Sequence, residues 1–211
     1  MEFLADLDEY FCERFANYDL FCGLPQYRMP TMHKTVTDEY GRKTSFTLPK
    51  ETMRLAKQEN KAELLAIVKT KLVCRDFTFS FHPLKWHQTF KHRFGKTGFV
   101  KIATMVAQHN NLTFEQLFEG TTVNEEIVQG LKKGAFLPTK NLLFSVALSA
   151  HLSADDTEAL MVVCGMDWDY TLQRDIVVQY LLRQRVFNAD MVWSALDEYK
   201  VKYLYLKRTD A

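Results

Sequence analysis

The apolar positions in the first half of the chain predict two helices with a hairpin between them. Residues 2–21 carry apolar side chains at the three-to-four spacing of one helix face, and residues 49–71 repeat that spacing. The intervening residues 32–48 are rich in β-branched and aromatic side chains around an Asp-Glu-Tyr-Gly turn at 38–41, a pattern typical of a short hairpin. An isolated hairpin is only marginally stable, so we expect this one to pack against a helix.

Residues 77–94 show two different patterns of apolar positions. Three phenylalanines alternate with polar residues over 77–81, which predicts a short strand, and residues 84–94 then predict a short basic helix. Trp86, Phe90 and Phe94 recur at every fourth position of that helix, so the pattern favours a buried aromatic face. Under the alternative hypothesis the rings stay exposed among the basic residues and stack on nucleobases.

From residue 98 onward the pattern is helical. Seven segments with helical periodicity follow one another, the first at 99–109 and the last two at 172–185 and 189–200. Polar residues suited to helix N-caps accompany them, namely Thr113, Thr139, Ser153, Thr171 and Asn188. These regularly spaced N-cap residues predict a bundle of short, well-capped helices.

Two glycines, Gly95 and Gly98, mark a joint between these regions. We therefore predict a mainly α protein with an α+β N-terminal domain over 1–97 and a helical domain over 98–211. The tail at 201–206 alternates between apolar and polar residues, which predicts a strand added to the N-terminal hairpin.

The charge of the chain is balanced overall and uneven locally. Its 211 residues are 47% hydrophobic and carry a net charge of +1, so the chain can bury a substantial core and lacks the general basic excess of many nucleic-acid-binding proteins. No acidic residue occurs between Asp76 and Glu115. That acid-free segment holds Lys85, Lys91, Arg93, Lys96 and Lys101. Basic residues interleaved with aromatic rings are suited to contact phosphates and bases.

Neither an enzyme nor a metal site is predicted. The sequence has no glycine-rich phosphate loop, GxSxG or HExxH motif, and its four cysteines form no CxxC pair. His82, His87 and His92 recur every five residues, a spacing that turns metal ligands apart on a helix. Scattered thiols, the lack of a signal-peptide pattern and the lack of an apolar run near the roughly 18 residues of a membrane span favour a cytoplasmic location. We expect a non-enzymatic protein without cofactor, metal or membrane contact.

A spaced series of short motifs begins after residue 111. In order it contains LTFEQL at 112–117, Val-Asn at 123–124, Lys-Gly at 133–134, Pro-Thr at 138–139 and LSAHLS at 148–153. With a helix at 99–109 before it, this series resembles the Xre/Cro branch of the lambda-repressor-like helix-turn-helix fold. The whole chain also resembles a bacterial family with the same two-part layout, a resemblance that implies no activity.

In the helix-turn-helix family the second helix of the motif enters the DNA major groove. The resemblance therefore implies that the first residues of that helix contact a partner, and that nearby basic residues contact the DNA backbone. The first group is Asn124, Glu125, Glu126 and Gln129, and the second is Lys132, Lys133, Lys91, Arg93, Lys96 and Lys101.

Two hypotheses follow from these residues. Under the first, the protein is a DNA-binding transcription regulator, dimeric as this family usually is. Under the second, it is a protein-interaction adaptor that reuses the fold without binding DNA. The pair Glu125 and Glu126 opposes the first hypothesis, because carboxylates repel phosphates. A further interpretation is that the pair only complements the helix dipole.

Overall fold

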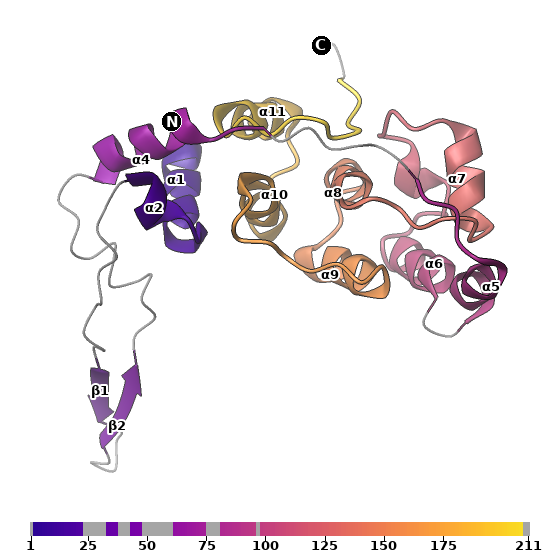
Figure 1. The fold of residues 1–211 in the computed structure, drawn as a ribbon, viewed down its shortest axis with the longest axis horizontal. Helices are drawn as coiled ribbons and strands as arrows, with labels where there is room; N and C mark the ends of the chain where they lie inside the picture. Colours follow the sequence, from indigo (N-terminus) through magenta and orange to yellow (C-terminus); the bar gives the residue numbers. More distant parts are fainter. Residues whose placement is uncertain are drawn as a thin grey trace.

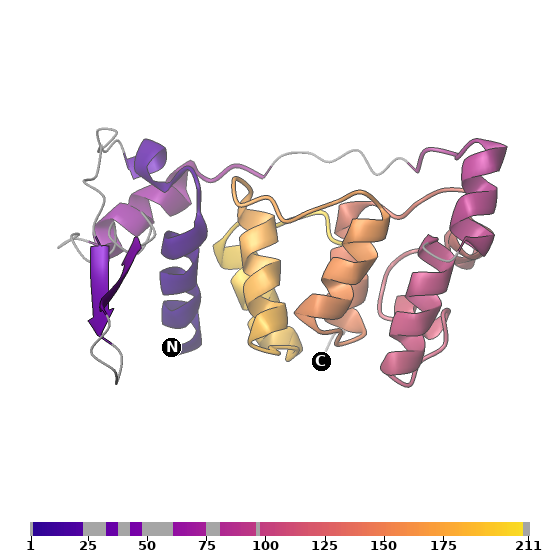
Figure 2. The ribbon, with the colours of Figure 1, turned by 90° about the horizontal axis from the view of Figure 1, so that it is seen from below.

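The computed structural model describes residues 2–22, 33–37, 43–47, 61–74, 81–95 and 98–208, and these residues are mainly helical (Figure 1). The helices before residue 98 are α1 (Glu2–Arg14), α2 (Tyr18–Cys22), α4 (Lys61–Lys71) and α5 (Trp86–Phe94). They are followed by α6 (Phe99–His109), the 3-10 turn η1 (Gln116–Phe118), α7 (Glu125–Lys132), α8 (Lys140–Ser149), α9 (Ala154–Val163), α10 (Gln173–Arg183) and α11 (Ala189–Glu198). Figure 2 shows the helices side by side in a row, with α1 near one end and α5 and α6 at the other.

Strands β1 (His33–Thr37) and β2 (Lys43–Thr47) pair antiparallel, in a register that places Val36 opposite Thr44. The turn predicted at 38–41 lies outside the described residues, so the complete hairpin stays a prediction. The same holds for most of the strand predicted at 77–81, of which only the last residue is described.

The first helix packs against the last two, although they are far apart in the sequence. The rings of Phe11 and Tyr199 lie 4.4 Å apart, and both side chains are buried. The Tyr10 hydroxyl donates to Gln179 Oε1 at 2.7 Å, and the Tyr199 hydroxyl donates to Asp8 Oδ1 at 2.6 Å. The buried side chains of α1 thus share one hydrophobic cluster with those of α10 and α11. The predicted domain boundary stays a prediction.

Most predicted helix caps are confirmed. The side chains of Thr139, Ser153 and Asn188 each accept a hydrogen bond from the N–H three residues later, which satisfies an otherwise unpaired donor. The prediction of Thr171 as a cap is wrong, because α10 begins after Leu172, which makes no side-chain cap. The Thr171 hydroxyl donates instead to Asp169 Oδ1 at 2.6 Å.

The helix predicted for LTFEQL is a single 3-10 turn. Thr113 and Gln116 form the expected reciprocal pair, since Thr113 N donates to Gln116 Oε1 at 2.8 Å and Gln116 N donates to Thr113 Oγ1 at 3.2 Å. The helix does not continue, because the carbonyl oxygen of Phe118 accepts hydrogen bonds from both the N–H and the hydroxyl of Thr121. The prediction of an α-helix at this position is wrong.

The C-terminal tail lies against the segment that follows η1. Thr122 N donates to Tyr205 O at 2.7 Å, Lys207 N donates to Gly120 O at 3.1 Å, and Leu206 forms a β-bridge with Thr121. The prediction that this tail extends the N-terminal hairpin is therefore wrong. The alternating pattern indicated extended backbone, and the pairing segment is 120–122.

Candidate partner-binding surface

Helix α7 is the helix to which the resemblance assigns partner recognition, and its N-terminal end is acidic. Glu125 and Glu126 lie exposed in its first turn, and Gln129 is half-exposed one turn later. Asn124 is the N-cap, since its Oδ1 accepts from Ile127 N at 3.0 Å. The two carboxylates lie where the helix dipole is positive, so they stabilise the helix whatever it binds.

The C-terminal end of α7 is less basic than the sequence predicts. Lys132 Nζ forms an ion pair with Glu115 Oε1. The hydrogen bond from Lys132 lowers the pKa of the Glu115 carboxyl, so this carboxyl stays ionised and compensates the lysine. Lys133 is exposed at the C-cap. Of the two lysines predicted to contact a DNA backbone here, only Lys133 lacks an ion pair with another described residue.

A shallow hollow lies along the exposed side of α7, lined by Glu125, Glu126, Gln129, Gly130 and Lys133. Its floor includes a glycine for a packing reason, because a Cβ atom at Gly130 would lie 2.5 Å from Cε1 of Phe136. The Phe136 ring in turn lies 4.9 Å from the ring of Phe81. A glycine that costs helix stability is therefore used here for close approach of a ring.

Helix α5 points its aromatic residues outward. Trp86, Phe90 and Phe94 are 83%, 63% and 60% exposed. We call these three side chains the aromatic face. Thr89 and His92 are half-buried and lie on the opposite side of the helix. Burial, followed by the neighbouring Lys91, lowers the pKa of His92, which fits an inward-pointing imidazole. The prediction of a buried aromatic face is wrong.

Close backbone packing explains the orientation of α5. Gly134 has a φ of 69°, and a Cβ atom added there would lie 3.1 Å from the carbonyl oxygen of Thr89. A Cβ atom at Gly98 would clash with the carbonyl oxygen of His92. Leu84 N donates to Ala135 O at 2.8 Å and fixes the start of the helix. There is no room for aromatic rings on the inner side of α5, so they lie on the outer side.

Basic side chains border the aromatic face. Lys85, Lys91 and Arg93 are exposed, and we call them the basic border. The guanidinium carbon of Arg93 lies 4.9 Å from the ring centroid of Phe94. No ion pair between described residues uses any of the three. The aromatic face and the basic border thus form one amphipathic surface.

The structure brings together only part of the predicted site. A Cβ atom at Gly134, just after α7, would lie 3.3 Å from Cβ of Arg93, so α5 lies beside the C-terminal end of α7. Lys101 is exposed on α6, and Lys96 lies outside the described residues. The acidic pair is at the other end of α7. The predicted residues therefore form an acidic end and a basic end separated by the length of α7.

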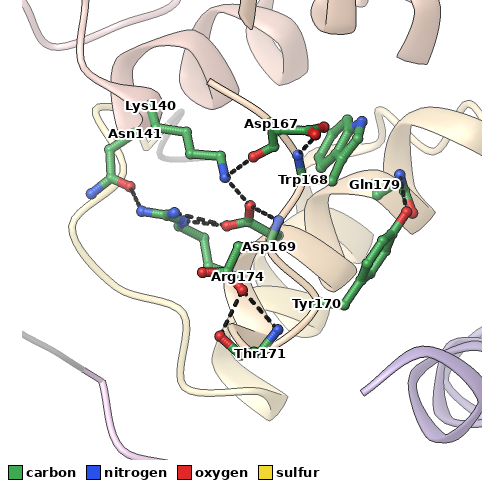
Figure 3. A network of polar contacts seen from close by, with 10 residues as sticks. Lys140, Asn141, Asp167, Trp168, Asp169, Tyr170, Thr171, Arg174 and Gln179 are labelled. Atoms are coloured by element: carbon green, nitrogen blue, oxygen red, sulfur yellow. Dashed lines mark hydrogen bonds and ion pairs between the residues drawn. The ribbon is translucent and has the colours of Figure 1, made fainter. Parts of the chain in front are cut away.

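A network of buried charges, which the sequence did not reveal, joins α8 to α10 (Figure 3). The Asp175 carboxylate is fully buried and accepts from Arg174 Nη2 at 2.7 Å, from Asp169 N at 2.9 Å and from Lys140 Nζ. Asn141 Oδ1 accepts from Arg174 Nη1 at 2.5 Å. Two cations and the backbone N–H of Asp169 thus compensate the buried carboxylate, and removal of one charged partner would leave the other uncompensated.

The network also fixes neighbouring loops. Asn141 Nδ2 donates to the carbonyl oxygen of Tyr203 at 3.2 Å and so holds the C-terminal tail. Thr171 N donates to Asp169 Oδ1 at 2.9 Å in the loop before α10. Because the charges are compensated within the network, we assign it a structural role. The only sequence signal is the Arg-Asp pair that precedes the apolar run of α10.

The described residues do not point to metal or thiol chemistry. They contain no group of three or more His, Cys, Asp or Glu side chains placed to hold a metal ion. Burial raises the pKa of the Cys12 thiol to about 11 and that of the Cys164 thiol to about 12, which disfavours the reactive thiolate. None of the helices in the described part of the chain is long and apolar enough to cross a bilayer.

None of the protein-family models, curated proteins or solved structures compared with the chain matches it. The helix-turn-helix resemblance therefore rests on motif spacing and stays a prediction. Along the chain, α6, η1, α7, α8 and α9 occupy the places of the five expected helices, with a 3-10 turn in place of the second.

Proposed function

We propose that this protein is a non-enzymatic protein-interaction adaptor that reuses a helix-turn-helix-like core. The observation that carries the proposal is the exposed aromatic face of α5. Contiguous exposed apolar side chains mark interaction sites, and protein interfaces are enriched in aromatic residues and arginine. The packing of the inner side of α5 leaves these rings exposed to solvent, and a bound partner would bury them.

The charges on α7 support an adaptor over a DNA reader. DNA affinity depends on lysine and arginine that neutralise phosphates. The end of α7 that would enter the groove carries exposed Glu125 and Glu126, and Lys132 is already paired with Glu115. A carboxylate can accept a hydrogen bond from cytosine, but two adjacent carboxylates near the backbone repel phosphates.

A second candidate function, DNA-binding transcription regulation, is favoured by the basic end of the surface. Lys91, Arg93, Lys101 and Lys133 are exposed, and the segment that holds the first three contains no acidic residue. Such a surface would contact phosphates without reading bases. Dimerisation would double the number of contacts.

One titration separates the two functions. Fluorescence anisotropy of a labelled random-sequence duplex is measured in low salt with the wild type, with Glu125→Gln/Glu126→Gln and with Lys91→Ala/Lys133→Ala. The adaptor proposal predicts no binding by any variant up to tens of micromolar protein, whereas non-specific DNA binding falls at roughly 10⁻⁴–10⁻⁶ M even at physiological salt. Micromolar binding that the glutamine pair strengthens and the alanine pair weakens would support the regulator instead.

The positive test of the adaptor is partner retention. Wild-type protein should retain a defined partner from cells, and Trp86→Ala/Phe90→Ala should lose it. Met105→Ala/Val162→Ala is the matched control, because these side chains are also apolar and exposed but lie on α6 and α9. Equal retention by all three proteins would contradict the proposal.

A further inference from the structure

The aromatic face and its basic border together define a partner chemistry. Resting on the proposed adaptor function, we infer that α5 docks as a helical ridge into an apolar groove bordered by carboxylates on a partner protein. The inference concerns what the partner looks like, whereas the proposed function states only that a protein partner exists.

The geometry of α5 fits a ridge. Trp86, Phe90 and Phe94 lie at positions i, i+4 and i+8, which form one stripe along a helix. At a rise of about 1.5 Å per residue the stripe is about 12 Å long. Anchors at this spacing are typical of a helix that lies in an apolar groove.

The stripe is held in place before any partner arrives. Leu84 N is bonded to Ala135 O before the helix, and Pro83 forms a β-bridge with Phe136. Gly134 lies against the middle of the helix at Thr89. A surface that is already ordered loses less conformational entropy when it docks than a flexible segment would.

The surrounding charge selects an acidic partner. The basic border has no acidic neighbour between Asp76 and Glu115 in the sequence, and no described residue forms an ion pair with it. A second copy docked through the same face would bring two basic borders together, which opposes self-association. Carboxylates around the groove would remove that repulsion and accelerate encounter.

The ring spacing leaves no room for a nucleobase between Phe90 and Phe94. The ring centroids of Phe90 and Phe94 lie 5.1 Å apart, so the two rings are in contact. A base held between two rings needs roughly 7 Å between them, twice the stacking distance of about 3.4 Å along a strand. The guanidinium of Arg93 also covers the Phe94 ring, with 4.9 Å from its carbon to the ring centroid.

The test uses two labelled model peptides and the full-length protein. The acidic peptide is a helical hairpin with leucine along the groove between its two helices and glutamate elsewhere, and the basic peptide has lysine in place of every glutamate. Anisotropy titrations compare the wild type with Lys91→Glu/Arg93→Glu, with Phe90→Ala and with the control Val162→Ala. Circular dichroism confirms that each variant is folded.

We expect the wild type to bind the acidic peptide at least about tenfold more tightly than the basic one, a difference that salt reduces. The charge-reversed variant should prefer the basic peptide. Phe90→Ala should weaken acidic-peptide binding about tenfold or more, as at an interface anchor, and Val162→Ala should not.

The failures are distinguishable. Equal binding of both peptides, or an unchanged preference after charge reversal, overturns the acidic partner and leaves the adaptor function standing. A dimer in sedimentation that Phe90→Ala abolishes also overturns it, because a second copy is then the occupant. Binding of an oligothymidine but of neither peptide, again lost in Phe90→Ala, overturns the adaptor function itself. Absence of binding to either peptide up to millimolar concentration overturns the inference.

Discussion

Truncation of Phe90 tests the outward orientation of α5. Little more than a third of the Phe90 side chain is covered, since 63% is exposed. Full burial of a phenylalanine contributes about 1.5–3 kcal/mol, so the covered part contributes at most about 1 kcal/mol. Phe90→Ala leaves no cavity at an exposed site, so we expect it to cost less than about 1 kcal/mol.

Phe144 provides the matched comparison. Its side chain is 0% exposed and stacks on Trp168 with 5.4 Å between ring centroids. Phe144→Ala should cost about 3–5 kcal/mol, because it removes buried surface and leaves a cavity. For a chain of this size about 1 kcal/mol shifts the melting temperature by about 2–4 °C. We therefore expect a decrease below about 4 °C for Phe90→Ala and of roughly 6–20 °C for Phe144→Ala.

The assay is thermal and urea unfolding followed by far-ultraviolet circular dichroism. A loss of about 3 kcal/mol or more for Phe90→Ala, similar to that of Phe144→Ala, would refute the reasoning. Such a result would mean that the aromatic face is buried in the protein and is not available to a partner.

Three further predictions concern the interior and the titrating groups. Asp175→Asn should cost about 3–5 kcal/mol in urea unfolding, because it leaves the buried Arg174 and the half-buried Lys140 without their carboxylate. A cost below about 1 kcal/mol would contradict the role of the network. At Asp156, burial raises the pKa, but hydrogen bonds from Asn110, Ser153 and His109 outweigh it and lower the pKa below the ordinary value. The ionised Asp156 therefore stabilises the protein fully above the ordinary pKa of an aspartate, and this stabilisation is lost as pH falls through the lowered pKa of the folded state. Asp156→Asn should therefore flatten the decline in melting temperature on acidification below about pH 4. An unchanged slope of melting temperature against pH would contradict this prediction. At about pH 8 the native protein should react with a thiol reagent more slowly at Cys12 and Cys164 than at Cys74. The reason is that burial raises the pKa of the Cys12 thiol to about 11 and that of the Cys164 thiol to about 12. Equal labelling rates at these cysteines, measured by mass spectrometry, would contradict the prediction.

Features that depend on neighbouring residues could be predicted from the sequence. The caps at Thr139, Ser153 and Asn188 each involve a side chain and an N–H three residues later, so sequence spacing alone reveals them. Most helix bodies likewise follow from apolar periodicity, but the single helix predicted over 2–21 is divided into α1 and α2. The 3-10 turn η1 was missed because its termination depends on Thr121, which the helical pattern does not include.

The direction in which a helix face points could not be predicted. Periodicity placed Trp86, Phe90 and Phe94 on one side of α5, and the assumption that apolar sides face inward was wrong. The orientation of α5 is set by two glycines outside the helix, Gly98 and Gly134. Their backbone packs closely against the side of α5 opposite the aromatic face.

The candidate site was altered by contacts over long sequence distances. Lys132 was predicted to be available to a partner, but Glu115, 17 residues earlier, forms an ion pair with it. The buried network shows the same limit, since Asn141 and Arg174 are 33 residues apart. Their pairing requires the packed arrangement of α8 and α10, which local spacing does not encode.

The packing of α1 against α10 and α11 has a consequence for synthesis on the ribosome. Tyr10 and Gln179 are 169 residues apart, and Asp8 and Tyr199 are 191 residues apart. Helix α1 is therefore synthesised well before its partners in α10 and at Tyr199, and contacts of such long range form slowly. In the nascent chain the ring of Phe11 is apolar surface without Tyr199 to cover it, which favours aggregation until synthesis reaches Tyr199.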